Sequence, residues 1–162
     1  MRIVADTGPI IALAKIGKIF LLKSIAGEVL IPPMVYKELF GKIGSESNEI
    51  DRALNTFIRL KREITLDEAT EMALADLGEG EKQAIGLASN LGEDVLLLVD
   101  DRAGRRIAEK LNIATTGLVG LLVVAKEMGF VESVGPLIED LRHNGYWLSD
   151  DLITTAKRLA GE

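Results

Sequence analysis

Short apolar runs alternate with segments of helical periodicity along this chain, and this alternation restricts the possible folds more than any other feature. The run Val95–Val99 is apolar at every position, as expected of a strand that is covered on both faces. The runs Arg2–Ala5 and Glu28–Ile31 have similar lengths and are also followed by helical patterns. Such alternation is typical of parallel sheets with helices on both faces. We therefore expect an α/β fold, a three-layer α/β/α sandwich built on a parallel sheet.

The other elements are predicted from the same two periodicities, with glycine and proline marking many of their ends. Pro32 and Pro33 end the strand Glu28–Ile31 and open a helix that carries Glu38. Thr65 or Asp67 can cap the helix that follows them. The remaining expected helices are Thr7–Lys15, Ile19–Ile25, Ser47–Leu60, Glu68–Ala75, Glu81–Leu91, Arg105–Leu111, Leu118–Met128, Val134–Arg142 and Asp150–Leu159, and the remaining strands are Arg62–Leu66 and Ile113–Thr115.

Length and composition favour one domain and narrow the chemistry that the chain can perform. The 162 residues, 48% of them hydrophobic, suffice for one packed core, so residues 1–162 are expected to form a single domain. The absence of cysteine excludes disulfides, zinc–thiolate sites, iron–sulfur clusters and thiol nucleophiles. The only histidine is His143, which excludes a multi-histidine metal site within one chain. Catalysis would have to rest on carboxylates, hydroxyls, lysines or backbone groups.

The chain is expected to be a cytoplasmic protein with no membrane segment. Its N-terminus reaches a charged residue too early for a secretory signal, and no apolar run approaches the roughly 20 residues that span a bilayer. The formal net charge of −6 argues against tight nonspecific binding of nucleic acid, because phosphates are neutralised by clustered lysine and arginine.

Three aspartates stand where predicted strands end. Asp6 follows the strand Arg2–Ala5, and Asp100 and Asp101 follow the run Val95–Val99. In open α/β sheets, ligands bind outside the carboxyl ends of the strands, so these acids are expected to meet in one crevice. Like charges repel at short range, and a cluster of them is stable when a cation neutralises it. Ligands that are all oxygen favour the hard cations Mg²⁺ or Mn²⁺.

Each of these acids also has an ordinary structural interpretation. Asp6 and Asp101 each precede a predicted helix and could serve only as its N-cap. Because adjacent strand residues face opposite ways, only one of Asp100 and Asp101 is expected to contact metal directly, and we choose Asp101, with Asp100 in support. Thr7 could hydrogen-bond a carboxylate or a metal-bound water, or it could simply begin the helix.

Two glutamates on predicted helices are candidates for the same cluster. Glu38 lies at the edge of an apolar helical stripe, although a surface ion pair would also explain it. Glu79 and Glu81 are two residues apart, so a helix points them roughly 200° apart and only one can face the crevice. Glu81 shares the buried side of its helix with Ile85, whereas Glu79 is expected to cap the helix or face solvent. Three arginines that follow the acidic strand end could contact phosphates or simply line a solvated helix face: Arg102, Arg105 and Arg106.

These motifs, in this order, resemble those of PIN-domain proteins, in particular VapC-type toxin ribonucleases of a branch with a Gly-Glu motif on the central helix. Each motif is degenerate alone, and their order and spacing together are specific. Typical members carry an aspartate at the position of Glu81, whose longer side chain could shift the metal site. The matching segments extend over essentially the whole chain: VADTGPIIALAK, PPMVYKEL, GEGEKQAIGLA, LLLVDDRAGRRIAEKLNI, TGLVGLLVVAKEMG and HNGYWLSDDLITTAKRLAGE.

The resemblance implies a sheet with strand order 3-2-1-4-5, Mg²⁺- or Mn²⁺-dependent cleavage of RNA, homodimerisation and inhibition by a small antitoxin protein. It implies metal-binding and catalytic roles for the acids named above: Asp6, Glu38, Glu81 and Asp101, with Asp100 as a further metal ligand. The main alternative is a catalytically inactive PIN-like interaction module.

Two further classes share single features with the chain. The triplet Asp6-Thr7-Gly8 matches the aspartic proteases, but their fold is nearly all β and needs two such aspartates. A phosphate-accepting receiver domain also gathers acids at strand ends.

Overall fold

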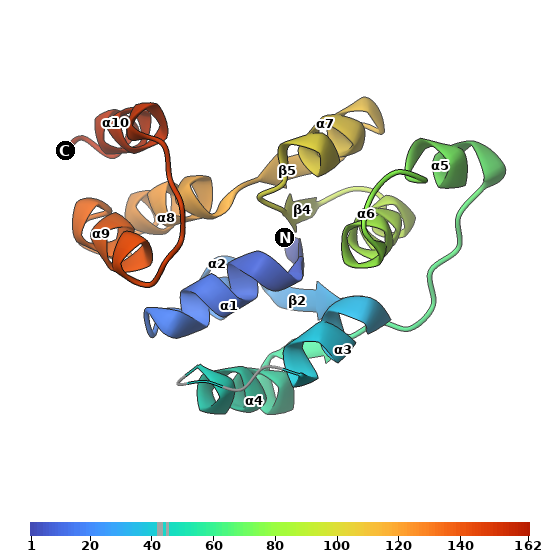
Figure 1. The fold of residues 1–162 in the computed structure, drawn as a ribbon, viewed down its shortest axis with the longest axis horizontal. Coiled ribbons are helices and arrows are strands. Elements are labelled where there is room, and N and C mark those ends of the chain that lie inside the picture. Colours follow the sequence, from blue (N-terminus) through green and yellow to red (C-terminus); the bar gives the residue numbers. More distant parts are fainter. Residues whose placement is uncertain (42–43, 45) are drawn as a thin grey trace.

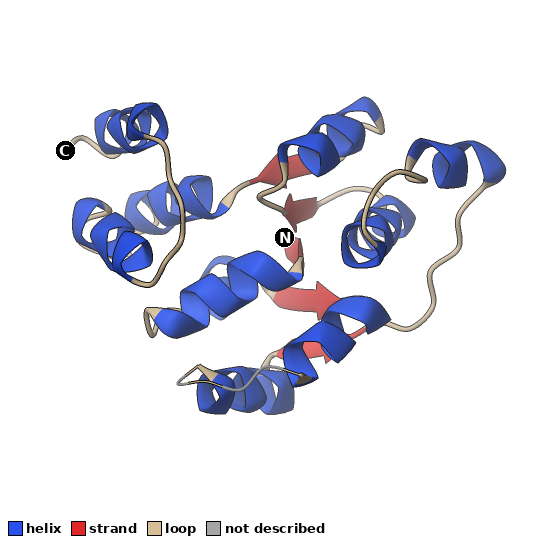
Figure 2. Ribbon diagram, viewed as in Figure 1, coloured by secondary structure: helices blue, strands red, loops and turns tan. Residues whose placement is uncertain are grey.

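A five-stranded parallel sheet lies between two layers of helices (Figure 1 and Figure 2). The computed structural model describes residues 1–41, 44 and 46–162. The strands are β1 (Arg2–Ala5), β2 (Glu28–Ile31), β3 (Ile58–Leu60), β4 (Val95–Leu98) and β5 (Ala114–Thr116). They are hydrogen-bonded in the order β3-β2-β1-β4-β5, and each neighbouring pair is parallel. The predicted fold class and strand order are confirmed.

The helices divide between the two faces of the sheet (Figure 2). One face is covered by α1 (Thr7–Lys15), α2 (Leu21–Ile25), α3 (Pro33–Phe40), α4 (Ser47–Thr56), α8 (Leu118–Glu127), α9 (Gly135–His143) and α10 (Asp150–Leu159). The other face is covered by α6 (Glu79–Leu91) and α7 (Arg102–Lys110), with α5 (Glu68–Ala73) at its margin.

Alternate residues of the central strands supply the two cores. Ile3 and Ala5 of β1 belong to the larger cluster, together with side chains of α1 and α8, whereas Val4 packs in the smaller cluster with α6. The same alternation places Ile31 and Leu30 on opposite faces of β2. Each aliphatic side chain buried in this way stabilises the fold by about 1.5–3 kcal/mol relative to an exposed one. Because both faces are covered, the central strands are apolar at nearly every position.

The region after α4 differs from the prediction. The predicted helix Ser47–Leu60 ends at Thr56, and the edge strand is Ile58–Leu60, in place of the predicted Arg62–Leu66. Ile58 pairs with Val29 of β2, so the chain passes from helix to strand at Phe57 with no glycine or proline to mark the change.

Residues 61–67 have no regular secondary structure and run across the smaller core. Ile64 and Leu66 pack there, close to Gly86 of α6. The Asn90 side chain takes the place of a neighbouring strand, because its Oδ1 accepts from the Thr65 amide at 2.7 Å and its Nδ2 donates to the Thr65 carbonyl. The alternating burial that suggested a strand is present, but a side-chain amide supplies the backbone partner.

Capping residues set two other boundaries that the prediction placed too late. Asp101 caps α7, which therefore begins at Arg102, and Gly78 precedes α6, which begins at Glu79. Of the two proposed caps for α5, Asp67 is the one used, accepting from the Thr70 amide at 2.7 Å. In the described residues, no helix has the length and apolar character needed to cross a membrane.

Candidate functional site

The sheet brings the first and fourth strands together at their carboxyl ends. Ala5 is paired with Leu98, and the Asp6 amide donates to the Leu98 carbonyl at 3.0 Å. Asp6 thus leaves the sheet beside the segment that carries Asp100 and Asp101. The N-terminal part of α6 and the helix α3 lie next to this edge (Figure 1).

Two of the aspartates at this edge cap helices and still belong to the cluster. Asp6 Oδ1 accepts from the Thr7 amide at 2.8 Å, and Asp101 Oδ2 accepts from the Gly104 amide at 2.8 Å. Each cap engages one carboxylate oxygen, which leaves the second oxygen of each side chain for other contacts. The capping interpretation and the cluster interpretation are therefore compatible for both residues.

The Glu38 and Glu81 carboxylates lie against two glycines, next to Asp6 and Asp101. A Cβ atom on Gly80 would lie 2.8 Å from Glu38 Oε1 and 3.5 Å from Asp6 Oδ1. A Cβ atom on Gly104 would lie 2.9 Å from Glu81 Oε2 and 3.6 Å from Asp101 Oδ2. The absence of side chains at these two positions makes room for the glutamates beside the aspartates.

A side-chain hydrogen bond joins the two helices that carry the glutamates. The Met34 amide, in the first turn of α3, donates to Gln83 Oε1 of α6 at 2.8 Å. This bond satisfies an amide that would otherwise have no partner within its own helix. It also relates the position of Glu38 to that of Glu81. Glu79 is turned away and pairs with Lys82 at 3.6 Å.

The charges of the cluster act on one another. Burial raises the pKa of Asp6, and the charges of Glu38, Asp100 and Asp101 raise it further against the hydrogen bond from Thr7. The pKa of Glu81 is raised from 4.5 to about 7. Burial is the largest cause, and the nearby Asp101, Asp6 and Glu38 raise the pKa further. Glu81 Oε2 is buried and has no hydrogen-bond donor among the described residues. The Glu81 and Asp101 carboxyl groups are close enough for a hydrogen bond. This bond can form only when one of the two carboxyl groups is protonated.

Asp100 has a different environment from the other acids. Its Oδ1 accepts from the Leu118 amide at the start of α8 at 2.8 Å, and its Oδ2 accepts from the Tyr146 hydroxyl. Burial raises its pKa, and the Leu118 hydrogen bond and the nearby Arg105 oppose this rise. Both oxygens of Asp100 thus already hold other parts of the chain in place.

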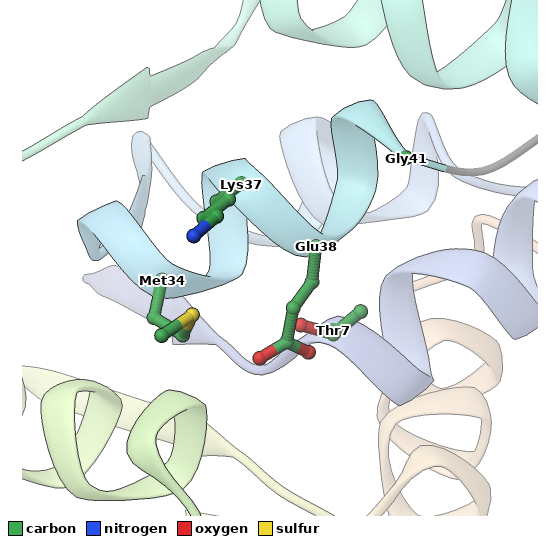
Figure 3. Close-up of a pocket in the computed structure, with 5 residues that line it drawn as sticks. All are labelled: Thr7, Met34, Lys37, Glu38 and Gly41. Atoms are coloured by element: carbon green, nitrogen blue, oxygen red, sulfur yellow. The ribbon is translucent and has the colours of Figure 1, made fainter.

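A small open pocket of about 380 Å³ flanks Glu38 (Figure 3). The Glu38 side chain extends from α3 toward Thr7 at the start of α1, and Lys37 and Met34 also line the pocket (Figure 3). The Thr7 hydroxyl is buried and has no hydrogen-bond partner among the described residues. It is therefore a buried polar group beside Glu38 whose hydrogen-bonding capacity the described residues do not use.

The three predicted arginines do not share one environment. Arg102 and Arg105 line a groove that begins at Asp100 and continues to the segment Tyr146–Ser149. Arg106 is exposed and is not part of the groove.

Comparison with known proteins identifies the family. The sequence matches the family described as PIN domain (DUF3368) over residues 2–162. The chain belongs to the PIN-domain family. A solved structure of a PilT N-terminus domain protein from the hyperthermophilic archaeon Sulfolobus solfataricus P2 is similar in fold, with a TM-score of 0.53 and 18% sequence identity over 77% of this chain and 93% of that chain. Among curated proteins, no significant match was found.

PIN domains are typically metal-dependent nucleases, so the fit of this site to a divalent cation is the next question. Three features favour it: the ligands available are all oxygen, the buried Glu81 Oε2 has no donor among residues 1–41, 44 and 46–162, and two glycines leave space beside the carboxylates. Within the described part of the chain, no group of three or more acids is arranged closely enough to hold an ion as it stands. The Glu38 and Asp101 side chains are exposed at this edge of the sheet.

The metal-free PIN domain is expected to lose stability as the pH rises from 4.5 to about 7. A carboxyl whose pKa is raised on folding contributes fully below its unfolded value, and this contribution is lost as the pH rises through the folded value. Glu81 has this property, and Asp6 and Asp100, with raised pKa values, act in the same direction. Thermal unfolding in the presence of chelator measures the effect. We expect Glu81→Gln to flatten the profile, and a wild-type Tm that increases across this window would contradict the assigned environment.

Several site features have no recognisable signal in the sequence. The bond between Gln83 and Met34 joins residues 49 positions apart, and that between Tyr146 and Asp100 joins residues 46 apart. The sequence hints at the role of Gly80 only through the Gly-Glu pattern. No local pattern indicates that Gly104 leaves space for Glu81.

Proposed function

We propose that this PIN domain is a metal-dependent endoribonuclease in which Asp6, Glu38, Glu81 and Asp101 hold one or two Mg²⁺ or Mn²⁺ ions. The proposal is supported above all by one observation: carboxylates from four separate segments converge at the carboxyl edge of the sheet, and the buried Glu81 oxygen among them has no donor in the described part of the chain. A buried carboxylate without a partner is costly, and a cation would remove this cost.

Asp100 is assigned a positioning role in this proposal, and Asp101 the direct contact with metal. Asp100 is engaged by Leu118 and Tyr146, whereas Asp101 engages one oxygen in its cap and is exposed. Thr7, with its unpartnered hydroxyl, would bind a water or a carboxylate at the edge of the site.

The reaction is hydrolysis of a phosphodiester bond. The oxygen of a water molecule bonds to phosphorus while the water gives up a proton, the bond from phosphorus to one ribose oxygen breaks, and that oxygen takes up a proton. A bound divalent cation supplies acidity to its water ligand and offsets negative charge on the phosphate oxygens. The protein contributes anionic side chains at one edge of the sheet, where the caps orient Asp6 and Asp101 and the Gln83 bond joins α3 to α6.

RNA as substrate has to be reconciled with the net charge of −6. Part of that charge lies in the cluster itself, where a cation would cancel it. Arg102 and Arg105 supply positive charge immediately beside the acids. The charge balance at the site therefore differs from that of the whole chain.

The proposal extends to the biological role that the VapC resemblance implies: the toxin of a toxin–antitoxin pair, acting as a homodimer and inhibited by a small protein partner. Expression of the chain in a bacterial host, with Glu38→Gln as control, tests this role separately from the chemistry. Growth arrest by the wild type alone is expected, and equal growth of both strains would argue for a nuclease with another role.

A ribonuclease assay tests the enzymatic proposal. Purified wild type and Glu38→Gln are incubated with single-stranded RNA in Mg²⁺ or Mn²⁺ and in chelator. Glu38 is exposed, so the substitution removes a charge without disturbing the core. Cleavage is expected only for the wild type with metal. Equal cleavage by both proteins would identify a contaminant and remove the claim.

A further inference from the structure

The groove that begins at Asp100 is larger than the pocket beside Glu38, about 630 Å³ against about 380 Å³. It is lined by the start of α7, by β5 and the first turn of α8, and by the segment Tyr146–Ser149 with the start of α10. Its lining combines two arginines with apolar surface and the exposed Trp147. Asp100 lines this groove and is also one of the clustered acids, so the groove continues directly from the acid cluster.

Trp147 is the only tryptophan in the chain, and its side chain is 83% exposed. Burial of an aromatic side chain would stabilise the fold, so exposure at this position has to be explained by something other than folding. The neighbouring Leu148 is buried in the larger core, which directs Trp147 outward. An exposed ring next to a residue anchored in the core is suited to contact a flat apolar ligand.

The segment that carries Trp147 is held on both sides. The Tyr146 hydroxyl donates to Asp100, Leu148 packs in the core, and Ser149 Oγ caps α10 by accepting from the Leu152 amide at 3.2 Å. The backbone at Trp147 is therefore fixed, and only the two side-chain torsions of the ring are free. Stacking of a ligand on this ring would therefore cost little conformational entropy of the protein.

Two arginines, Arg102 and Arg105, line the groove together with the ring. Arg105 lies beside Asp100 and close to Gly117, where its Nη1 would be 3.4 Å from a Cβ atom, and Arg102 is exposed at the start of α7. Guanidinium groups bind phosphates with paired hydrogen bonds. The groove thus combines guanidinium groups, one of them near Asp100, with an exposed aromatic ring.

We infer that this groove binds the single-stranded RNA segment next to the scissile phosphate, with Arg102 and Arg105 on its backbone and a base stacked on Trp147. Aromatic rings with neighbouring cations are the combination that binds single-stranded nucleic acid, because every base offers a stacking face. A duplex keeps its bases stacked on one another and cannot offer them to the ring. The inference rests on the proposed function and specifies the path of its substrate.

The single tryptophan allows a direct test that does not depend on catalysis. Its fluorescence is followed while short single-stranded RNA is added to Asp6→Asn protein, which keeps the RNA intact. We expect saturable quenching, and little quenching by the same sequence as a duplex. Binding of labelled RNA measured by anisotropy is expected to weaken about 5- to 150-fold in Trp147→Ala, the range for loss of one stacked base, and to recover in Trp147→Phe.

Adjacent arginines provide a matched pair for the phosphate contacts. Arg102→Ala with Arg105→Ala is expected to weaken binding and to lower the slope of log affinity against log salt by about 1.4, since each phosphate contact to a single strand contributes about 0.7. Arg106→Ala removes one positive charge outside the groove and is expected to leave both values near those of the parent protein.

The possible results separate the inference from the proposed function. Metal-dependent cleavage with unchanged RNA affinity in Trp147→Ala would overturn the inference and leave the nuclease proposal standing. Quenching by RNA with no cleavage by the wild type would overturn the nuclease proposal and leave the RNA-binding groove standing. Anisotropy that reports binding without any quenching would place the strand elsewhere. A blue shift of the emission as protein concentration rises, without RNA, would show that a second copy covers the ring, and this result would also overturn the inference.

Discussion

Asp6→Asn is expected to lower metal-dependent RNA cleavage by roughly 100- to 1,000-fold, the usual cost of removing one preorganised polar group from an active site. Asp6 occupies the carboxyl end of the central strand, where its charge adds to those of Glu38, Asp100 and Asp101. Asparagine has the same shape but no negative charge, so a cation would lose a ligand. Steady-state cleavage of a labelled RNA measures the effect.

The same variant separates catalysis from helix capping. Asparagine caps helices about as well as aspartate, so Asp6→Asn is expected to keep the bond to the Thr7 amide and a Tm near that of the wild type. Asp6→Ala loses both the charge and the cap, and its stability is expected to fall by about 1 kcal/mol. An Asp6→Asn protein that cleaves at the wild-type rate would leave Asp6 with a capping role alone.

Gly104→Ala is expected to impair cleavage by roughly 10- to 100-fold without destabilising the protein, because displacement of a catalytic group by about 1 Å can cost that much. The new Cβ atom would lie 2.9 Å from Glu81 Oε2 and would push this carboxylate away from Asp101. Alanine is favoured over glycine inside a helix by up to about 1 kcal/mol, so thermal unfolding is expected to show an equal or higher Tm.

Gly8→Ala is the matched control. Gly8 also lies in the first turn of a helix beside the site, but no atom outside its own helix lies within 4 Å of the Cβ position. This variant is expected to keep the wild-type cleavage rate. If Gly104→Ala and Gly8→Ala were equally active, the space at Gly104 would not serve the site.

The layered fold and the meeting of acids at one edge of the sheet could be predicted because both depend on strong local patterns. A strand covered on two faces must be apolar at nearly every position, as at β4, and the aspartate that follows it must leave the sheet at its carboxyl edge. Periodicity on α6 distinguished the inward Glu81 from the solvent-facing Glu79, which pairs with Lys82.

Features that depend on distant partners could not be predicted in the same way. The edge strand Ile58–Leu60 follows α4 with only Phe57 between them, and its identity is determined by pairing with β2 and not by its own pattern. Asp100 and Asp101 are adjacent and chemically equal in the sequence. Only the contacts of Asp100 with Leu118 and Tyr146 distinguish the two.

Calorimetric titration of Mn²⁺ into the metal-free protein tests most directly whether the clustered carboxylates form a cation site. Saturable binding is expected at or below millimolar metal for the wild type and for Glu79→Gln, which alters an acid outside the cluster. Binding is expected to be lost or strongly weakened in Glu81→Gln, which alters the buried oxygen that has no donor. No detectable binding by the wild type, or equal binding by Glu81→Gln and Glu79→Gln, would contradict the account and favour an interaction module without catalytic activity.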